Sequence, residues 1–128
     1  GAAMIPVDQT IYGGEAGNCL AACIASLLHL EIEAVPNVCE GGEGWFERLS
    51  TWLLPRGLVP LCFKGPPLPQ LGAALCIVSG ASPRGDFLHA TVWRGDALVH
   101  DPHFSRDGIG EVADTLYLIP LDPYQETR

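Results

Sequence analysis

The chain has few basic residues. Its 128 residues include seven Lys and Arg against fifteen Asp and Glu, which gives a formal net charge of -8. An acidic surface repels phosphate backbones, so this balance argues against a nucleic-acid partner and favours a basic or peptide-like one. The sequence also lacks an apolar run long enough to cross a membrane, and no segment has the pattern of a secretory signal. We therefore expect a cytoplasmic chain with no membrane partner.

Paired cysteine spacings are missing as well. The chain has five cysteines, an odd number, and no two of them form a CxxC pair. This pattern fits neither a disulfide framework nor a zinc-finger spacing, and it favours a reducing compartment. Four of the five lie in apolar segments, where a thiol packs as a small core side chain. The cysteines are Cys19, Cys23, Cys39, Cys62 and Cys76.

The sequence shows no internal repeat and no low-complexity tract. A length of 128 residues suits one compact domain, and an apolar share of 48% is enough for a core. We interpret residues 1–4 (GAAM) as an expression remnant before a native start at Met4, and we expect residues 5–128 to form a single domain. Residues 64–72 are rich in Pro and Gly, and we expect them to connect two lobes of that domain.

Apolar spacing divides the chain into two helices followed by strands. Residues 5–18 are typical of an irregular arm, and residues 19–30 predict a helix that is apolar on nearly all sides and therefore buried. Residues 45–54 predict a second, amphipathic helix, which Pro55 and Gly57 stop. Helices followed by a mainly antiparallel sheet indicate an α+β domain. The expected strands are 58–63, 74–79, 88–94, 97–101 and 115–121.

Cys19 stands at the first turn of the predicted helix, directly after Asn18, which is a good N-cap residue. The partial positive charge at a helix N-terminus lowers the pKa of a thiol and favours the nucleophilic thiolate. A packing cysteine in a buried helix is the alternative at this position. A catalytic role needs a base, a group that orients the base, and donors for an oxyanion.

Residues 87–103 (FLHATVWRGDALVHDPH) supply a candidate base and a candidate orienting group on a β-hairpin. With a three-residue turn at 94–96, His89 faces Asp101 on one side of the hairpin, and the carboxylate fixes the tautomer of the imidazole. With a two-residue turn the register slips by one residue, and Asp101 points to the other face. The sequence leaves both turns open. In the first register, Cys19, His89 and Asp101 form a catalytic triad.

The oxyanion donors are expected near the start of the same helix. The backbone N–H of Cys19 supplies one donor, and the second must come from a side chain of the preceding arm. We choose Gln9 for this role, with Asn18 as the competing candidate.

Residues 79–85 (SGASPRG) form a polar loop shortly before His89. One interpretation is a plain connector between strands. The other is a rim of the cleft, in which Ser82 and Arg84 bind the substrate.

His100 and His103 flank Asp101, so two His and one Asp fall within residues 100–103. A tetrahedral or facial metal site needs further ligands, and no residue at a suitable spacing supplies them. We therefore expect no metal and no cofactor.

These residues resemble those of the papain-like cysteine peptidases. That family carries a Gln, then a Cys at the start of a central helix, then a His on a strand and an Asp or Asn soon after. The peptidase domain of bacteriocin-processing transporters is the nearest pattern, with a (D/N)C(G)xAC helix start and a late H…V…DP segment. The matching residues are Gln9, NCLAAC at 18–23, His89 and VHDP at 99–102.

The sequence is also similar to small proteins of phage and prophage origin. Two positions depart from the peptidase pattern. Gln9 stands farther from Cys19 than the family Gln does, which the Gly-rich loop 13–17 has to absorb, and Leu20 replaces a glycine. The runs shared with the phage proteins cover most of the chain, at residues 17–28, 45–58, 78–90 and 100–108.

The resemblance implies a minimal papain-like fold, in which a central helix with Cys19 packs against a mainly antiparallel sheet with His89 and Asp101. It implies thiol-dependent hydrolysis of a peptide, isopeptide or side-chain amide bond through a thioester, with a protein or peptide as substrate. We expect a monomer, and the similarity to phage proteins implies that it is phage-encoded and acts in a host cell. Glutamine deamidation, acyl transfer and a non-catalytic binding module are the alternatives on the same scaffold.

Overall fold

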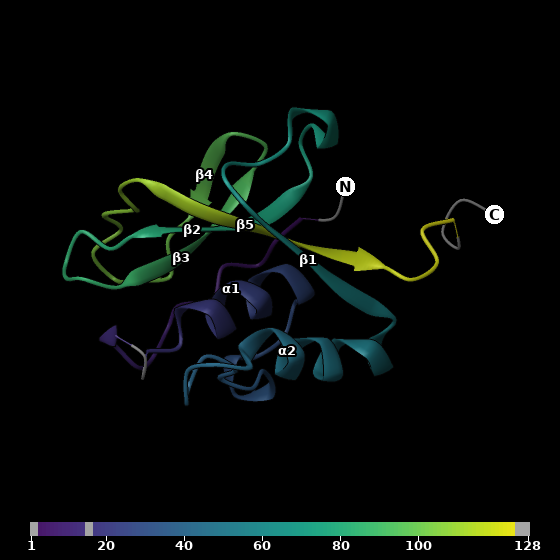
Figure 1. Ribbon diagram of the computed structural model, residues 1–128, viewed down its shortest axis with the longest axis horizontal. Coiled ribbons are helices and arrows are strands. Elements are labelled where there is room, and N and C mark those ends of the chain that lie inside the picture. The colour runs from purple at the N-terminus through teal and green to yellow at the C-terminus, as the bar shows by residue number, and fades with distance from the viewer. Residues whose placement is uncertain (1–2, 15–16, 125–128) are drawn as a thin grey trace.

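The computed structural model describes residues 3–14 and 17–124. Within this part of the chain, two α-helices precede five strands (Figure 1). The helices are α1 (Cys19–Leu28) and α2 (Trp45–Leu53), and the strands are β1 (Leu58–Lys64), β2 (Leu75–Ala81), β3 (Leu88–Arg94), β4 (Ala97–His100) and β5 (Val112–Pro120). Short 3-10 helices lie at η2 (Ile32–Ala34), η3 (Leu54–Arg56) and η4 (Pro69–Leu71).

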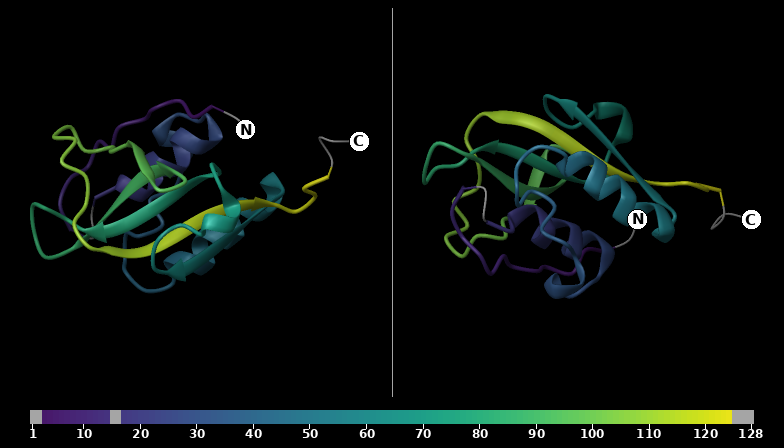
Figure 2. Two further views of the ribbon diagram at one scale, coloured as in Figure 1. Left: turned by 90° about the horizontal axis from the view of Figure 1, so that it is seen from above. Right: turned by 60° about the horizontal axis from the view of Figure 1, so that its bottom comes forward.

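The strands form one antiparallel sheet in the order β1-β5-β2-β3-β4. Both α-helices lie against the same face of the sheet, as the views in Figures 1 and 2 show. The predicted α+β class is therefore confirmed for the described residues. Neither helix in this part of the chain has the length and the apolar sequence needed to cross a membrane.

The core between the helices and the sheet is apolar. Ile24 of α1 and Leu49 and Leu53 of α2 are each 0% exposed, and the sheet contributes Val92 and Leu116. The burial of α1 follows from its sequence, because a helix that is apolar on nearly all sides needs cover all round. This packing fixes the start of α1 beside the first residues of β3, where the candidate site lies.

The first helix is shorter than the sequence predicts. It ends at Leu28 rather than at residue 30, because His29 takes a left-handed conformation with a φ of 58°. The backbone N–H of His29 donates to the carbonyl of Ala25 and closes the last turn.

Residues 64–72 do not connect two lobes, so that prediction is wrong. They follow β1 and lead through η4 towards β2, which lies in the same sheet. The backbone N–H of Leu68 donates to the hydroxyl of Tyr117 across 3.3 Å. Tyr117 belongs to a second apolar cluster with Cys76 and Val78, away from the main core. The Pro- and Gly-rich segment therefore links strands of one sheet.

The hairpin of β3 and β4 has the two-residue turn, since Arg94 pairs with Ala97. Of the two turns that the sequence leaves open, the structure therefore has the second. The register then shifts again within the hairpin, because Trp93 pairs with Leu98 whereas Val92 pairs with His100. This β-bulge places one extra residue in β4 and reverses the faces of everything beyond it. Asp101 therefore lies on the same face as His89, whereas the two-residue turn without the bulge would place it on the opposite face.

We expect Leu49→Ala to lower the free energy of unfolding by about 2–5 kcal/mol, because it opens a cavity in a fully packed site. The measurement is urea unfolding followed by circular dichroism. The matched control is Leu54→Ala, a side chain that is 57% exposed, which should change the value by less than about 0.5 kcal/mol. Equal losses from the two variants would contradict the assignment of the core.

Candidate active site

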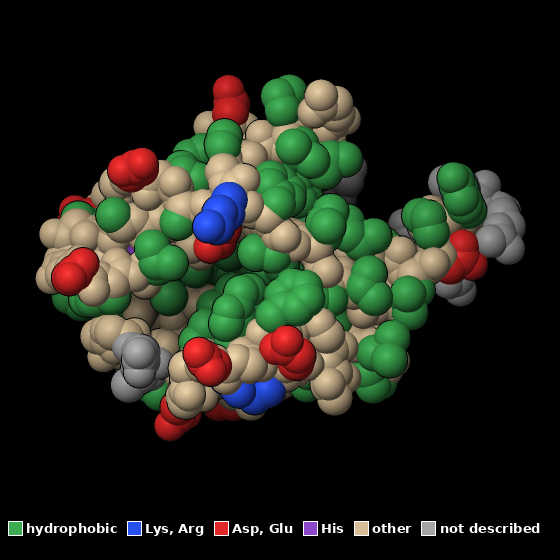
Figure 3. All heavy atoms as spheres, viewed as in Figure 1, with side chains coloured by type: hydrophobic (Ala, Val, Ile, Leu, Met, Phe, Trp, Pro, Cys, Tyr) green, Lys and Arg blue, Asp and Glu red, His purple; other side chains and the backbone are tan. Residues whose placement is uncertain are grey.

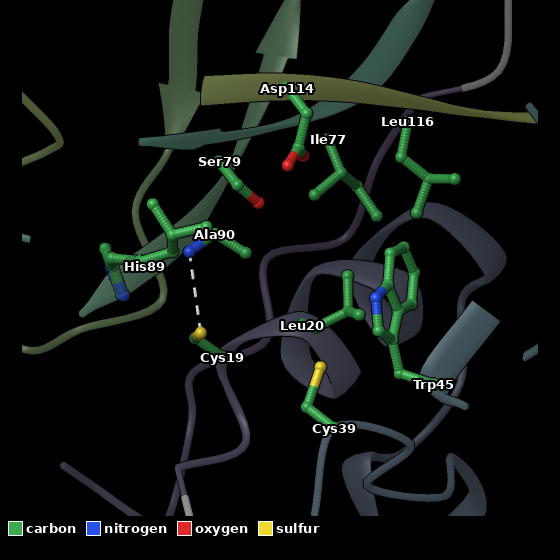
Figure 4. Close-up of a pocket in the computed structure, with 11 residues that line it drawn as sticks. Cys19, Leu20, Cys39, Trp45, Ile77, Ser79, His89, Ala90, Asp114 and Leu116 are labelled. Carbon is green, nitrogen blue, oxygen red and sulfur yellow. Dashed lines mark hydrogen bonds between the residues drawn. The ribbon is translucent and has the colours of Figure 1, made fainter. Parts of the chain in front are cut away.

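Cys19 is the first residue of α1, and it lies beside the start of β3 (Figure 4). Its Sγ accepts a hydrogen bond from the backbone N–H of Ala90, with 3.5 Å between nitrogen and sulfur. Cys19 and His89 line a cavity of about 150 Å³ together. They also line a smaller one of about 30 Å³. The thiol and the imidazole that the sequence pairs therefore share two cavities.

His89 and Asp101 form the contact that the predicted triad requires. The Nε2–H of His89 donates to Oδ1 of Asp101 across 2.7 Å, and the two side chains are 2% and 1% exposed. A charge-assisted hydrogen bond without water around it is among the stronger ones in proteins. The β-bulge in β4 makes this contact compatible with the two-residue turn.

Asp101 is held in place by the loop that follows it. Its Oδ1 also accepts from the backbone N–H of His103 across 2.9 Å, and its Oδ2 accepts from the N–H of Gly108 across 2.7 Å. Burial raises the pKa of Asp101, but the hydrogen bonds from His89, His103 and Gly108 outweigh it and lower the pKa below its ordinary value. Asp101 is therefore ionised at neutral pH.

The ionised carboxylate determines which nitrogen of His89 carries the proton. An ionised carboxylate only accepts, so Nε2 of His89 must be the donor. In the neutral imidazole, Nδ1 then has the free lone pair, and it has no hydrogen-bond partner among the described residues. Nδ1 is thus available to accept a proton from a neighbouring thiol.

The thiol of Cys19 is less acidic than its position at a helix start predicts. Burial raises its pKa above the ordinary value, although backbone N–H groups of Ala90, Leu20 and Cys19 itself act in the opposite direction. The expectation of a lowered pKa is therefore wrong, because desolvation outweighs the helix terminus. No hydrogen bond joins this thiol to His89 in the described part of the chain. Such contacts often tighten only when a substrate binds.

Gln9 reaches the same site from the N-terminal arm. It is 5% exposed, and it lines the smaller cavity together with Cys19 and His89. Its Nε2 donates to the carbonyl of Ile11 across 3.0 Å, which leaves its second amide hydrogen for another acceptor. Its Oε1 is buried and finds no hydrogen-bond partner in residues 3–14 and 17–124. Gln9 therefore remains the candidate for the second oxyanion donor.

Asn18 uses its side chain elsewhere. Its Oδ1 accepts from the N–H groups of Thr10 and Ile11, both across 2.9 Å, and its Nδ2 donates to the hydroxyl of Thr10 across 2.9 Å. It is the N-cap residue of α1, as the sequence predicts, but its side chain makes no cap hydrogen bond. These contacts hold the carboxamide of Asn18 against the arm, and Asn18, unlike Gln9, is not among the residues that line the two cavities around Cys19.

The arm is fixed by contacts that the sequence does not indicate. The N–H of Gln9 donates to the carbonyl of Pro102 across 3.0 Å. The guanidinium of Arg106 pairs with both carboxylate oxygens of Asp8, across 2.7 and 2.8 Å, over a separation of 98 positions. The imidazole of His100 lies 3.2 Å from the same carboxylate. Sequence reasoning missed Asp8 and Arg106 because no local pattern links residues so far apart.

The predicted rim residues separate into two roles. Ser82 accepts at Oγ from the N–H of Arg84 across 3.1 Å, and its own N–H donates to the carbonyl of Phe87 across 2.9 Å. Ser82 therefore shapes the turn and is not among the residues that line the two cavities around Cys19. Arg84 does line the smaller cavity, and its Nη1 donates to the hydroxyl of Ser105 across 3.1 Å.

His100, Asp101 and His103 do not converge on one point. His100 contacts the arm at Asp8, Asp101 binds His89, and Nδ1 of His103 lies 2.8 Å from the hydroxyl of Ser105. In the residues that the structure describes, no group of three or more His, Cys, Asp or Glu could hold a metal ion.

Comparisons with known protein families, with curated proteins and with solved structures find no match. No relative therefore indicates a reaction for this site. Its chemistry has to follow from the side chains around Cys19.

We expect Asp101→Asn to lower the free energy of unfolding by about 1–3 kcal/mol at pH 7, because buried donors lose their charged acceptor. The pKa of Asp101 is lower in the folded chain than its ordinary value. Its stabilising effect is therefore complete above about pH 4 and declines as the pH falls towards the folded pKa. Urea unfolding at about pH 7 and pH 3 should show a smaller difference between variant and native chain at the lower pH.

The matched control for that measurement is Asp96→Asn, which removes a carboxylate from the β3–β4 turn. It should cost less than about 0.5 kcal/mol at either pH. A loss for Asp101→Asn that is the same at both pH values would contradict the ionised, hydrogen-bonded carboxylate.

We expect the rate at which iodoacetamide modifies Cys19 to rise with pH from 6 to 9 without a plateau, because burial raises the pKa of this thiol and the thiolate reacts. Peptide mapping by mass spectrometry measures the rate at each cysteine. Cys39 has a pKa of about 11 and serves as the internal comparison. A plateau near neutral pH would instead reveal a thiolate that is already formed in the free protein.

Proposed function

We propose that the protein is a cysteine hydrolase that cleaves an amide bond through a Cys19–His89–Asp101 triad and a thioester intermediate. We further propose that its α+β fold is a minimal papain-like one. The order Gln9, Cys19, His89 and Asp101 along the chain supports that assignment, as does a nucleophile at the start of a helix packed on an antiparallel sheet.

The buried hydrogen bond between His89 and Asp101 is the observation that carries the proposal. A 2.7 Å contact between two side chains that are 2% and 1% exposed orients an imidazole beside a thiol. A packing cysteine needs no such neighbour. Burying a carboxylate and an imidazole is costly unless they are paired, so their placement next to Cys19 favours a catalytic role.

In the first step, Nδ1 of His89 takes the proton from the Cys19 thiol as Sγ forms a bond to the substrate carbonyl carbon. Because the pKa of the free thiol is raised, proton transfer accompanies attack rather than preceding it. The thiol must turn from the N–H of Ala90 towards His89 for this transfer. Asp101 stabilises the imidazolium that results.

The negative charge on the carbonyl oxygen then needs donors. The N–H of Cys19 at the helix start provides one, and the free amide hydrogen of Gln9 provides the other. The protonated His89 gives its proton to the leaving nitrogen as the C–N bond breaks. This leaves a thioester on Cys19 and a neutral Nδ1.

In the second step, His89 takes a proton from water while the water oxygen attacks the thioester carbon. The C–S bond then breaks, the carboxylic acid leaves, and the protonated His89 returns its proton to Sγ of Cys19. Only the acyl donor and the acceptor differ between peptide hydrolysis, glutamine deamidation and transfer to an amine, so the same groups serve all three. A protein or peptide substrate with basic side chains suits the net charge of -8.

We expect the protein to act on a library of peptides obtained from a proteome digest. Mass spectrometry identifies new termini if peptide bonds are cut and Gln-to-Glu conversion if side chains are deamidated. Cys19→Ala should abolish the activity, and His89→Ala should lower it by at least about 10³-fold. Gln9→Ala should lower it by about 10²–10³-fold through loss of an oxyanion donor.

The control is Cys62→Ala, which removes a half-buried thiol on β1 and should leave the activity within about twofold of the native chain. Activity that survives in Cys19→Ala would contradict the nucleophile. A folded protein without any activity on the library, and with a Cys19 no more reactive than Cys62, would favour a binding module instead.

A further inference from the structure

The larger cavity beside Cys19 has an apolar wall and one charged group. Its volume is about 150 Å³, which is enough to admit a single side chain. Asp114 and Ser79 bring oxygen atoms into it from β5 and β2, where they are paired neighbours, and Figure 4 shows both side chains directed into this space. The apolar wall includes Leu20, Cys39, Trp45, Ile77 and Leu116.

The carboxylate of Asp114 has no partner among the residues that the structure describes. The residue is half-buried, yet its side chain makes no hydrogen bond or ion pair with any described residue. Burial raises the pKa of this carboxyl group and is the one cause of its shift. A carboxylate that loses water without gaining a hydrogen-bond donor is unfavourable. A donor that binds to it therefore stabilises the site.

A candidate for an internal partner is Lys64, which is paired with Asp114 across β1 and β5. Lys64 is exposed at the end of its strand and makes no ion pair with this carboxylate in the described part of the chain. The hydroxyl of Ser79 is a neutral group and does not balance the charge. The charge of Asp114 therefore remains available to a group from outside.

We propose that Asp114 selects a substrate with a lysine or arginine side chain, whose apolar stem lies along the cavity wall and whose charged head meets the carboxylate. This inference rests on the proposed function, because the cavity matters for selection only if Cys19 reacts with what is bound there. A long basic side chain is the one natural type that combines an apolar stem with a cationic donor.

The charge of the whole chain points the same way. The net charge of -8 attracts cationic segments. In Figure 3 hydrophobic side chains gather on a face that has acidic side chains around it and a basic side chain among them. A glutamate side chain would meet like charge in the cavity, and an apolar one would leave the carboxylate without a partner.

The experiment uses peptidyl chloromethyl ketones, in which the thiol of Cys19 displaces chloride and His89 accepts the thiol proton. The probes carry lysine, norleucine or glutamate, either at the residue next to the ketone or one residue farther, and a glycine probe serves as reference. Intact-mass spectrometry measures the second-order rate at Cys19. Norleucine has a stem of similar length to that of lysine and no charge, so the ratio of the two rates isolates the charged head.

At one of the two positions, we expect the lysine probe to react about tenfold or more faster than the norleucine probe, and the glutamate probe to react slowest. Asp114→Asn should bring the ratio of lysine to norleucine close to one, and Asp114→Leu should favour norleucine. Asp96→Asn removes the same charge from the β3–β4 turn and should leave the ratio unchanged, which controls for long-range attraction.

The outcomes separate the two proposals. If the glycine probe modifies Cys19 in the native chain and not in His89→Ala, but the ratio is near one or is unchanged in Asp114→Asn, the selection by Asp114 is wrong and the hydrolase proposal stands. If no probe modifies Cys19 in the folded native chain, the hydrolase proposal fails and the selection falls with it.

Discussion

The carboxylate of Asp101 is buried and accepts hydrogen bonds from three parts of the chain: the ring of His89 on β3 and the backbone at His103 and Gly108. Burying this charge is unfavourable unless donors surround it, so the path of the loop after β4 is fixed by the need to bring its N–H groups to the carboxylate. The orientation of the imidazole follows from that path. So does the position of Pro102, against which the N-terminal arm pairs.

The arm adds the part of the site that the sheet does not supply. Gln9 comes to the cavity because its own N–H binds Pro102 and because Asp8 is clamped by Arg106. The long spacing between Gln9 and Cys19 is absorbed where Asn18 binds the backbone of Ile11, which brings together the two ends of the intervening Gly-rich loop. Separation along the chain thus says little about distance when a loop closes on itself.

The elements and the proximity of Cys19, His89 and Asp101 were predictable from the sequence, whereas the contacts that bring these residues together were not. Apolar spacing located α1, α2 and β3 closely, since buried faces leave a period in the sequence. The turn type and the β-bulge were not predictable, because both depend on the register in which β4 pairs with β3. The raised pKa of Cys19 depends on burial by distant residues, and no local motif reports that. Asp114 could not be chosen from the sequence either, because its importance depends on a cavity that residues from several distant segments form together.

The β-bulge and the two-residue turn of the β3–β4 hairpin compensate each other. Each one alone reverses the side on which Asp101 emerges, and together they restore it. In a hairpin that keeps His89 and Asp101 on the same face, a change of one residue in the turn must therefore be matched by the gain or loss of a bulge. A chain with one residue more in the turn would keep His89 and Asp101 together only without the bulge. Loss of a single residue from β4 would separate them and leave every other strand unchanged.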